Sequence, residues 1–155
     1  MRASAVRAAL ACAASAVLAT SCGSAAANGP PAYEVRGTVI SGLGRILADG
    51  AGMTLYLYAP DNRGPSVCKL GCLLGWPPLV LPKGVAKPLA GPGIDPALLG
   101  TDRGPGGRLQ VTYNKWPLYL YQGDLSPGQA NGQADAMGLW WVISVSGTVD
   151  RNVAS

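Results

Sequence analysis

Beyond Ala32, the apolar residues of this chain come in short runs separated by glycine, proline and asparagine. Runs such as Met53–Tyr58 and Leu139–Val145 have the length of a strand, and none of this region keeps a 3.6-residue apolar period. The 22 glycines and 13 prolines punctuate these runs, as is typical of turns. The pattern therefore predicts short β-strands joined by tight turns. One helical turn is expected at 94–99, where Pro96 suits a first helical position.

A motif that occurs twice organises these strands. Leu-Tyr-Leu-Tyr-x-x-Asp covers residues 55–61 and returns at 118–124, an offset of 63 residues. Because side chains alternate along a strand, the tyrosines of each copy share one face and the leucines the other. Both faces are apolar, as in a strand that is covered on both sides. The motif residues that carry polar groups are Tyr56, Tyr58, Asp61, Tyr119, Tyr121 and Asp124.

Flanking segments repeat as well, which indicates an internal duplication. Gly-Arg-Ile-Leu at 44–47 returns as Gly-Arg-Leu-Gln at 107–110, again 63 residues later, and Trp76 and Trp140 follow at almost the same separation. Each copy reads as strand, turn, strand and tryptophan segment. The predicted repeats cover about 44–79 and about 107–145.

Turn chemistry predicts a hairpin in each repeat, at Asp49–Gly52 and at Asn114–Pro117. A lone hairpin is marginal in water, so the two should pack together as one small sheet or barrel-like unit. We therefore predict an all-β fold, with a single domain over 33–155.

The N-terminus has the layout of a bacterial-type export signal. Arg2 and Arg7 precede an apolar stretch at 8–19, and small residues follow at 20–27. The apolar stretch is too short to span a bilayer, which takes about 20 residues. We assign 1–21 to a leader and 22–32 to a flexible tether rich in serine, alanine, glycine and proline.

Two processing sites compete in this leader. Ala19-Thr20-Ser21-Cys22 is similar to a lipobox, in which the cysteine is acylated and becomes the new N-terminus, although Ala19 stands where a branched aliphatic residue is usual. The alternative is cleavage after Ala27, at an A-x-A-like site that would release a secreted protein. We favour lipid anchoring through Cys22, outside the cytoplasm, with membrane lipid as the partner of the anchor.

Charge and composition set several function classes aside. Loss of Arg2 and Arg7 with the leader lowers the formal charge from +4 to +2, and the remaining cations are scattered singly, so no nucleic-acid footprint is visible. The chain has no histidine. That absence excludes C-x-x-C-H haem attachment, histidine-liganded zinc and nucleophilic catalysis by Ser-His or Cys-His pairs.

Several motifs in order give the chain a family resemblance over about 44–147. The doubled Y-x-Y-x-x-D motif occurs with Trp-Pro-Pro-Leu at 76–79, Cys68-x-x-x-Cys72, Gln-Val-Thr-Tyr-Asn at 110–114 and Pro-Leu-Tyr at 117–119. Together they resemble the predicted bacterial lipoproteins called secreted repeat of unknown function, whose hallmark is Y-x-aromatic-x-x-D. The resemblance implies an exported, often lipid-anchored protein with two repeats and no assigned activity. Lys115-Trp116 stands where the family more often has glycine.

Cys68 and Cys72 are the only cysteines beyond Cys22, and in an exported protein a disulfide is the expected state. A disulfide that closes such a small loop stabilises the fold by roughly 2 kcal/mol, by the chain-entropy estimate. One alternative is a redox-active pair. Another is a copper(I) site, and a copper(I) site would require further soft ligands.

Asp61 and Asp124 allow three interpretations. Paired carboxylates perform acid-base work in glycosidases, which would require the two groups to lie about 5 to 9 Å apart and open to solvent. Alternatively, each accepts backbone N–H bonds in the turn after its strand, which we favour. A calcium site is the third, but no Asp-rich loop supports it.

The aromatic residues have a packing interpretation and a binding interpretation. Tyrosine and tryptophan bury large areas in cores while their polar ends find hydrogen-bond partners. The alternative is an exposed strip for a glycan, quinone or protein, with Trp116 at a predicted hairpin tip and Trp76 as candidates. We expect a non-catalytic binding module that needs no cofactor or metal and contacts an envelope protein or glycan. A redox or copper-handling protein is the alternative.

Overall fold

The computed structural model of the chain describes residues 29–152. The leader 1–21, Cys22 and most of the tether 22–32 therefore lie outside the described residues. The last tether residues belong to the folded domain. The backbone oxygen of Pro31 accepts a hydrogen bond from Glu34 N at 2.8 Å, and it lies so close to Gly50 that a side chain there would collide with it.

The fold consists of short strands in three small sheets, so the all-β prediction is confirmed. Within residues 29–152 the sheets do not close into a barrel. The sheet orders are β2-β1-β4, β3-β8 and β5-β6-β7. The strands are β1 (Glu34–Ile40), β2 (Gly44–Asp49), β3 (Tyr56–Tyr58), β4 (Leu89–Ala90), β5 (Leu99–Arg103), β6 (Leu109–Tyr113), β7 (Trp116–Pro117) and β8 (Trp140–Val142).

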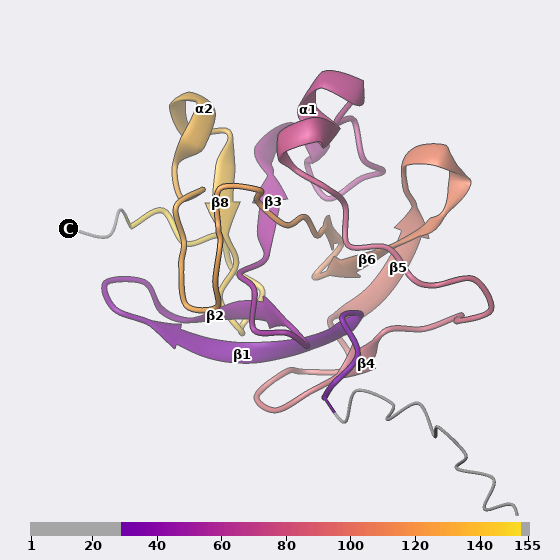
Figure 1. The fold of residues 1–155 in the computed structure, drawn as a ribbon, viewed down its shortest axis with the longest axis horizontal. Coiled ribbons are helices and arrows are strands. Elements are labelled where there is room, and N and C mark those ends of the chain that lie inside the picture. The colour runs from indigo at the N-terminus through magenta and orange to yellow at the C-terminus, as the bar shows by residue number, and fades with distance from the viewer. Residues whose placement is uncertain (1–28, 153–155) are drawn as a thin grey trace, which may run out of the picture.

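Helical segments are few and short. They are η1 (Ala59–Asp61), α1 (Leu70–Gly75), η2 (Pro105–Gly107) and α2 (Asp135–Gly138). The helical turn expected at 94–99 is a hydrogen-bonded turn, with Leu98 N donating to Asp95 O at 3.1 Å, and Leu99 already begins β5. In Figure 1, β1 and β2 run along the bottom of the molecule, whereas α1 and α2 lie at the top. No helix among the described residues has the length and apolar content to cross a bilayer.

Both predicted hairpin turns form. The Asp49 carboxylate closes the first turn, because its Oδ1 accepts hydrogen bonds from Ala51 N at 2.9 Å and Met53 N at 2.8 Å. The second turn has two central residues, Asn114 and Lys115, with φ of 47° and 67°. Positive φ at both positions is the backbone of a type I′ hairpin turn. Trp116 is therefore not at the tip of this hairpin but is the first residue of β7.

The two repeats make corresponding backbone hydrogen bonds, with one change of register. Leu55 N donates to Leu47 O at 3.0 Å in the first repeat, and the corresponding bond in the second repeat joins Leu118 N to Val111 O at 2.9 Å. Leu47 and Val111 are 64 residues apart, whereas Leu55 and Leu118 are 63 apart. The sequence match of 44–47 with 107–110 is therefore one residue out of structural register, because the first turn is one residue longer.

The first copy of the motif, which contains β3, separates two apolar clusters, as its alternation predicted. Leu55 and Leu57 belong to a cluster that extends to Val111 and Leu118, whereas Tyr56 lies in a second cluster. The second cluster contains the buried residues Leu43, Ile46, Tyr56, Cys68, Trp76, Tyr119, Trp140 and Val142. Each repeat contributes side chains to both clusters, so the two repeats share one core.

Candidate functional site

The two copies of the motif meet at Tyr56 and Tyr119. Tyr56 N donates to Tyr119 O at 2.8 Å and Tyr119 N donates to Tyr56 O at 2.9 Å, which makes a two-bond antiparallel contact. Along its other edge, Tyr56 pairs with Val142 of β8. Tyr119 pairs in the same way with Pro78. The centre of the molecule therefore has an approximate two-fold symmetry that exchanges the repeats.

Each motif tyrosine is bonded to the aspartate of the other repeat. Tyr56 Oη donates to Asp124 Oδ2 at 2.6 Å, and Tyr119 Oη donates to Asp61 Oδ2 at 2.7 Å. We call these two reciprocal pairs the Tyr–Asp clasp. Each tyrosine is bonded to the aspartate of the other repeat and not to that of its own, so the clasp joins the two copies of the motif across the molecule.

The second oxygen of each aspartate holds the loop that follows its motif. Asp61 Oδ1 accepts a hydrogen bond from Val67 N at 2.7 Å, and Asp124 Oδ1 accepts one from Asn131 N at 2.8 Å. The interpretation of both residues as acceptors of backbone N–H groups is therefore correct. The donors lie further along the chain than in an Asx-turn, so each carboxylate closes a complete loop.

The burial of both aspartates argues against an acid-base pair. Asp61 is 4% exposed and Asp124 is 6% exposed, so the solvent access that a glycosidase pair requires is missing. Burial raises the pKa of both carboxyls, and the hydrogen bonds from N–H and O–H groups oppose that rise. Burial, together with the neighbouring aspartate, raises the pKa of the Tyr56 and Tyr119 phenols far above neutral, so both remain donors.

Four aromatic rings stack beside the clasp. Trp76 and Trp140 are parallel at a centroid distance of 3.8 Å and an angle of 3°. Tyr121 stacks on the outer side of Trp76 at 4.2 Å, and Tyr58 lies on the outer side of Trp140 at 4.6 Å. The stack alternates residues of both repeats, so it ties them together as the clasp does. We call these four residues the aromatic stack.

The structure decides between the packing and the binding interpretation of Trp76 and Trp116. Trp76 is 6% exposed because it is inside the aromatic stack, and Trp116 is 8% exposed because it belongs to β7 and faces the core. The guanidinium of Arg63 lies over the Trp116 ring, 5.7 Å from its centroid. Core packing is therefore the correct interpretation of both indoles.

A disulfide joins Cys68 and Cys72, whose Cα atoms are 5.6 Å apart. Cys68 is 4% exposed and packs in the second cluster with Tyr119 and Trp76. Ser66, two residues earlier, has its Oγ 2.6 Å from Tyr119 Oη. The disulfide closes residues 68–72, directly after the loop that Asp61 closes. Within residues 29–152, no group of three or more histidine, cysteine, aspartate or glutamate side chains is arranged to hold a metal ion.

The comparisons identify a family. The family model described as "Secreted repeat of unknown function" matches residues 37–80 and 100–144, which together make up more than half of the chain. This chain belongs to that family. Each matched range contains one copy of the motif and starts in the strand pair that precedes it, before the predicted repeat limits at 44 and 107. No curated protein and no solved structure matches the chain.

Replacement of Tyr56 or Tyr119 by phenylalanine tests the clasp. Each change leaves a buried carboxylate oxygen without its O–H donor, so we expect the free energy of unfolding to fall by about 1 to 3 kcal/mol. The two losses should be similar because the pairs are reciprocal. The matched control is Tyr58→Phe, at the half-buried motif tyrosine outside the clasp, which should change stability by less than about 0.5 kcal/mol. Equal effects of all three substitutions in urea denaturation would refute the clasp.

The buried aspartates also predict how stability depends on pH. A carboxyl whose pKa is higher in the folded chain than in the unfolded one, where it is about 3.9, stabilises the fold below that value and loses this effect as pH rises through the folded pKa. Burial raises the pKa of Asp61 and Asp124, and it also raises the pKa of Asp49. Stability should therefore decline as the pH rises above about 4, and less steeply in an Asp61→Asn, Asp124→Asn double variant. Identical slopes in urea titrations would contradict the assignment.

Proposed function

We propose that this chain is an exported protein, lipid-anchored through Cys22, whose domain works outside the membrane as a non-catalytic binding module. The observation that carries the proposal is the Tyr–Asp clasp. Asp61 and Asp124 are each bonded to a tyrosine of the other repeat and to a backbone N–H, and both carboxylates are buried. The motif thus builds the domain, and the exposed surface is left for recognition.

Family membership and the disulfide support export. The chain belongs to a family of secreted repeats. Disulfides persist in oxidising compartments and are rare in the cytosol. The leader pattern of Arg2, Arg7 and the apolar stretch at 8–19 has the same implication. Two acyl chains on Cys22 would give a stable anchor, since one chain alone binds membranes only marginally.

The packing of Cys68 favours a structural disulfide over a redox or copper-handling one. A working thiol pair requires an accessible thiolate. Cys68 is buried against the second cluster, and Tyr119 of that cluster is within hydrogen-bond distance of Ser66 in the same loop. Reduction would disturb the clasp, which suits a bond that is formed once and kept.

Replacement of Cys22 tests the anchor, and Cys12 in the apolar stretch of the leader provides a matched control. We expect the wild-type protein and Cys12→Ala to be in the membrane fraction with the mass of an acylated N-terminus. Cys22→Ala should lose that mass and leave the membrane. Fractionation followed by intact mass measurement, with thiols trapped, reads both the anchor and the disulfide.

Either of two results would contradict this proposal. A wild-type protein that begins at Asn28 and is free of membrane would establish the secreted alternative, with cleavage after Ala27. Free thiols at Cys68 and Cys72 in the native protein, or a copper adduct, would replace the binding module with the redox or copper-handling alternative.

A further inference from the structure

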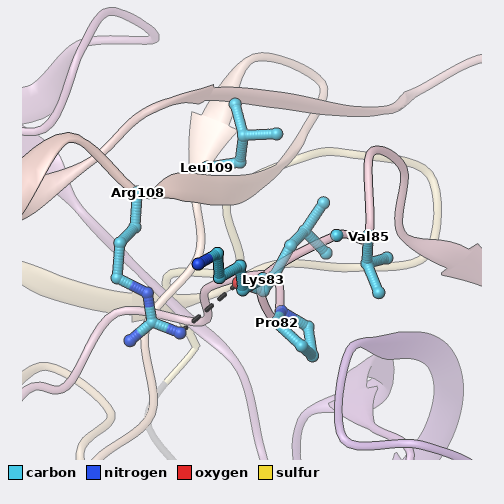
Figure 2. A pocket seen from close by; sticks show the side chains of 7 residues that line it. Pro82, Lys83, Val85, Arg108 and Leu109 are labelled. Carbon is cyan, nitrogen blue, oxygen red and sulfur yellow. Dashed lines mark hydrogen bonds between the residues drawn. The ribbon is translucent and has the colours of Figure 1, made fainter.

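A groove lies between the loop at 81–85 and the start of β6. It has a volume of about 470 Å³, which is within the range of about 300 to 1,000 Å³ of small-molecule sites. Its lining consists of Leu81, Pro82, Lys83, Gly84, Val85, Arg108 and Leu109. Figure 2 shows Arg108 and Val85 at opposite sides of the groove, with Lys83 between them and Leu109 above.

The groove combines an apolar floor with two cations. Leu81 is 3% exposed and is therefore packed in the core, whereas Leu109 is 37% exposed and presents apolar surface to solvent. Lys83 and Arg108 are both exposed at the rim. Arg108 Nη2 also donates to Leu81 O at 3.4 Å, a long bond that keeps the guanidinium over the floor.

The two cations have no carboxylate partner in the part of the chain that the structure describes. The groove lining there includes no aspartate or glutamate, and the ion pair found in residues 29–152 joins Arg36 to Glu34 at 3.6 Å. Two unneutralised cations beside an apolar floor favour a ligand with a negative head. A guanidinium presents a planar fork of donors that matches a phosphate or carboxylate.

The corresponding position in the other repeat is built differently. At the groove, Leu81 N donates to Leu109 O at 2.8 Å. The corresponding bond in the other repeat joins Val145 N to Arg45 O at 3.2 Å, so Val145 corresponds to Leu81 and Arg45 to Leu109. There the chain folds back as a tight turn, and Ile143 pairs with Val149. The Arg45 guanidinium lies against Gly93. The groove is therefore not imposed by the duplicated scaffold.

We propose that this groove binds an anionic amphiphile, with its phosphate or carboxylate head held by Lys83 and Arg108 and its apolar body on Leu81, Val85 and Leu109. The proposal rests on the proposed function as a binding module and names its ligand class. A bare anion would leave the apolar floor in water, and an uncharged amphiphile would leave the cations unpaired. Only a molecule with both parts satisfies the whole lining.

Decyl phosphate is the probe for this site. It is titrated by calorimetry into the exported full chain carrying Cys22→Ser, which needs no detergent, beside inorganic phosphate and decyl maltoside. We expect decyl phosphate to bind at least about tenfold more tightly than either comparator, because each comparator lacks one half of the match. Vesicles of anionic phospholipid tested beside zwitterionic ones identify the source. Binding to the anionic vesicles indicates a membrane lipid, and binding of decyl phosphate alone indicates a free amphiphile.

Substitutions locate the site. Lys83→Gln with Arg108→Gln should weaken decyl phosphate binding by about tenfold or more, since charge-assisted bonds to the head are lost. Lys87→Gln is the matched control, an exposed lysine four residues further along the same loop that does not line the groove, and it should bind as the parent does. Arg108 donates a hydrogen bond to Leu81 O, whereas the Lys83 side chain makes no hydrogen bond among the described residues. A loss of decyl phosphate binding in Lys83→Gln alone therefore cannot be assigned to unfolding.

Three results would overturn the proposal: equal binding of decyl maltoside, equal loss in Lys87→Gln, or no decyl phosphate binding by a folded protein. If the Cys22 experiment succeeds while any of these occurs, the groove assignment fails and the anchored module stands. If the protein proves to be secreted or redox-active, the proposed function fails independently of the titration.

Discussion

A buried carboxylate is the constraint on which this fold depends. An ionised aspartate removed from water is tolerated only where hydrogen-bond donors replace its hydration. Asp61 and Asp124 each receive an O–H from a tyrosine and an N–H from a loop. Because each tyrosine belongs to the opposite repeat, one repeat alone would leave its aspartate and its tyrosine unpaired. In this fold the motif is therefore satisfied only where two copies of it meet.

Other features of the domain follow from this crossing. The aromatic stack contacts the clasp, since the Tyr56 ring lies 5.3 Å from Trp76 and the Tyr119 ring 5.1 Å from Trp140, both in T-shaped arrangements. Buried surroundings of this kind strengthen hydrogen bonds to charge. Gly132 donates to Tyr56 Oη, and a side chain at that position would strike the Trp76 ring, so the loop after Asp124 needs a glycine there. The loop after Asp61 leads instead directly into the Cys68–Cys72 disulfide. The two repeats thus support equivalent pairs by different means.

Sequence reasoning recovered the parts of the fold that depend on local chemistry. Strand alternation placed the leucines and tyrosines of 55–58 in different clusters, and turn residues located both hairpins. The strand Leu99–Arg103 was missed because Leu-Gly-Thr-Asp-Arg has no apolar alternation and is half exposed. Trp116 was misplaced because the turn is two residues long, and a difference of one residue reverses the face of a strand.

The clasp itself was beyond the reach of the sequence. The bonded pairs are 68 and 58 residues apart, and a symmetric duplication is compatible with pairing inside each repeat as well as between repeats. Only the antiparallel contact of Tyr56 with Tyr119 decides between the two. The groove was hidden for a related reason, since Lys83 and Arg108 are isolated in the sequence and meet only when Leu81 pairs with Leu109.

Native-state hydrogen exchange tests most directly whether the two repeats form one cooperative unit through the clasp. In Asp124→Asn, which alters only the second repeat's carboxylate, the account predicts an equal loss of protection at amides of both repeats, including Tyr56 and Tyr119. If residues of the second repeat lost protection while those of the first kept theirs, the repeats would be independent and the account would be wrong.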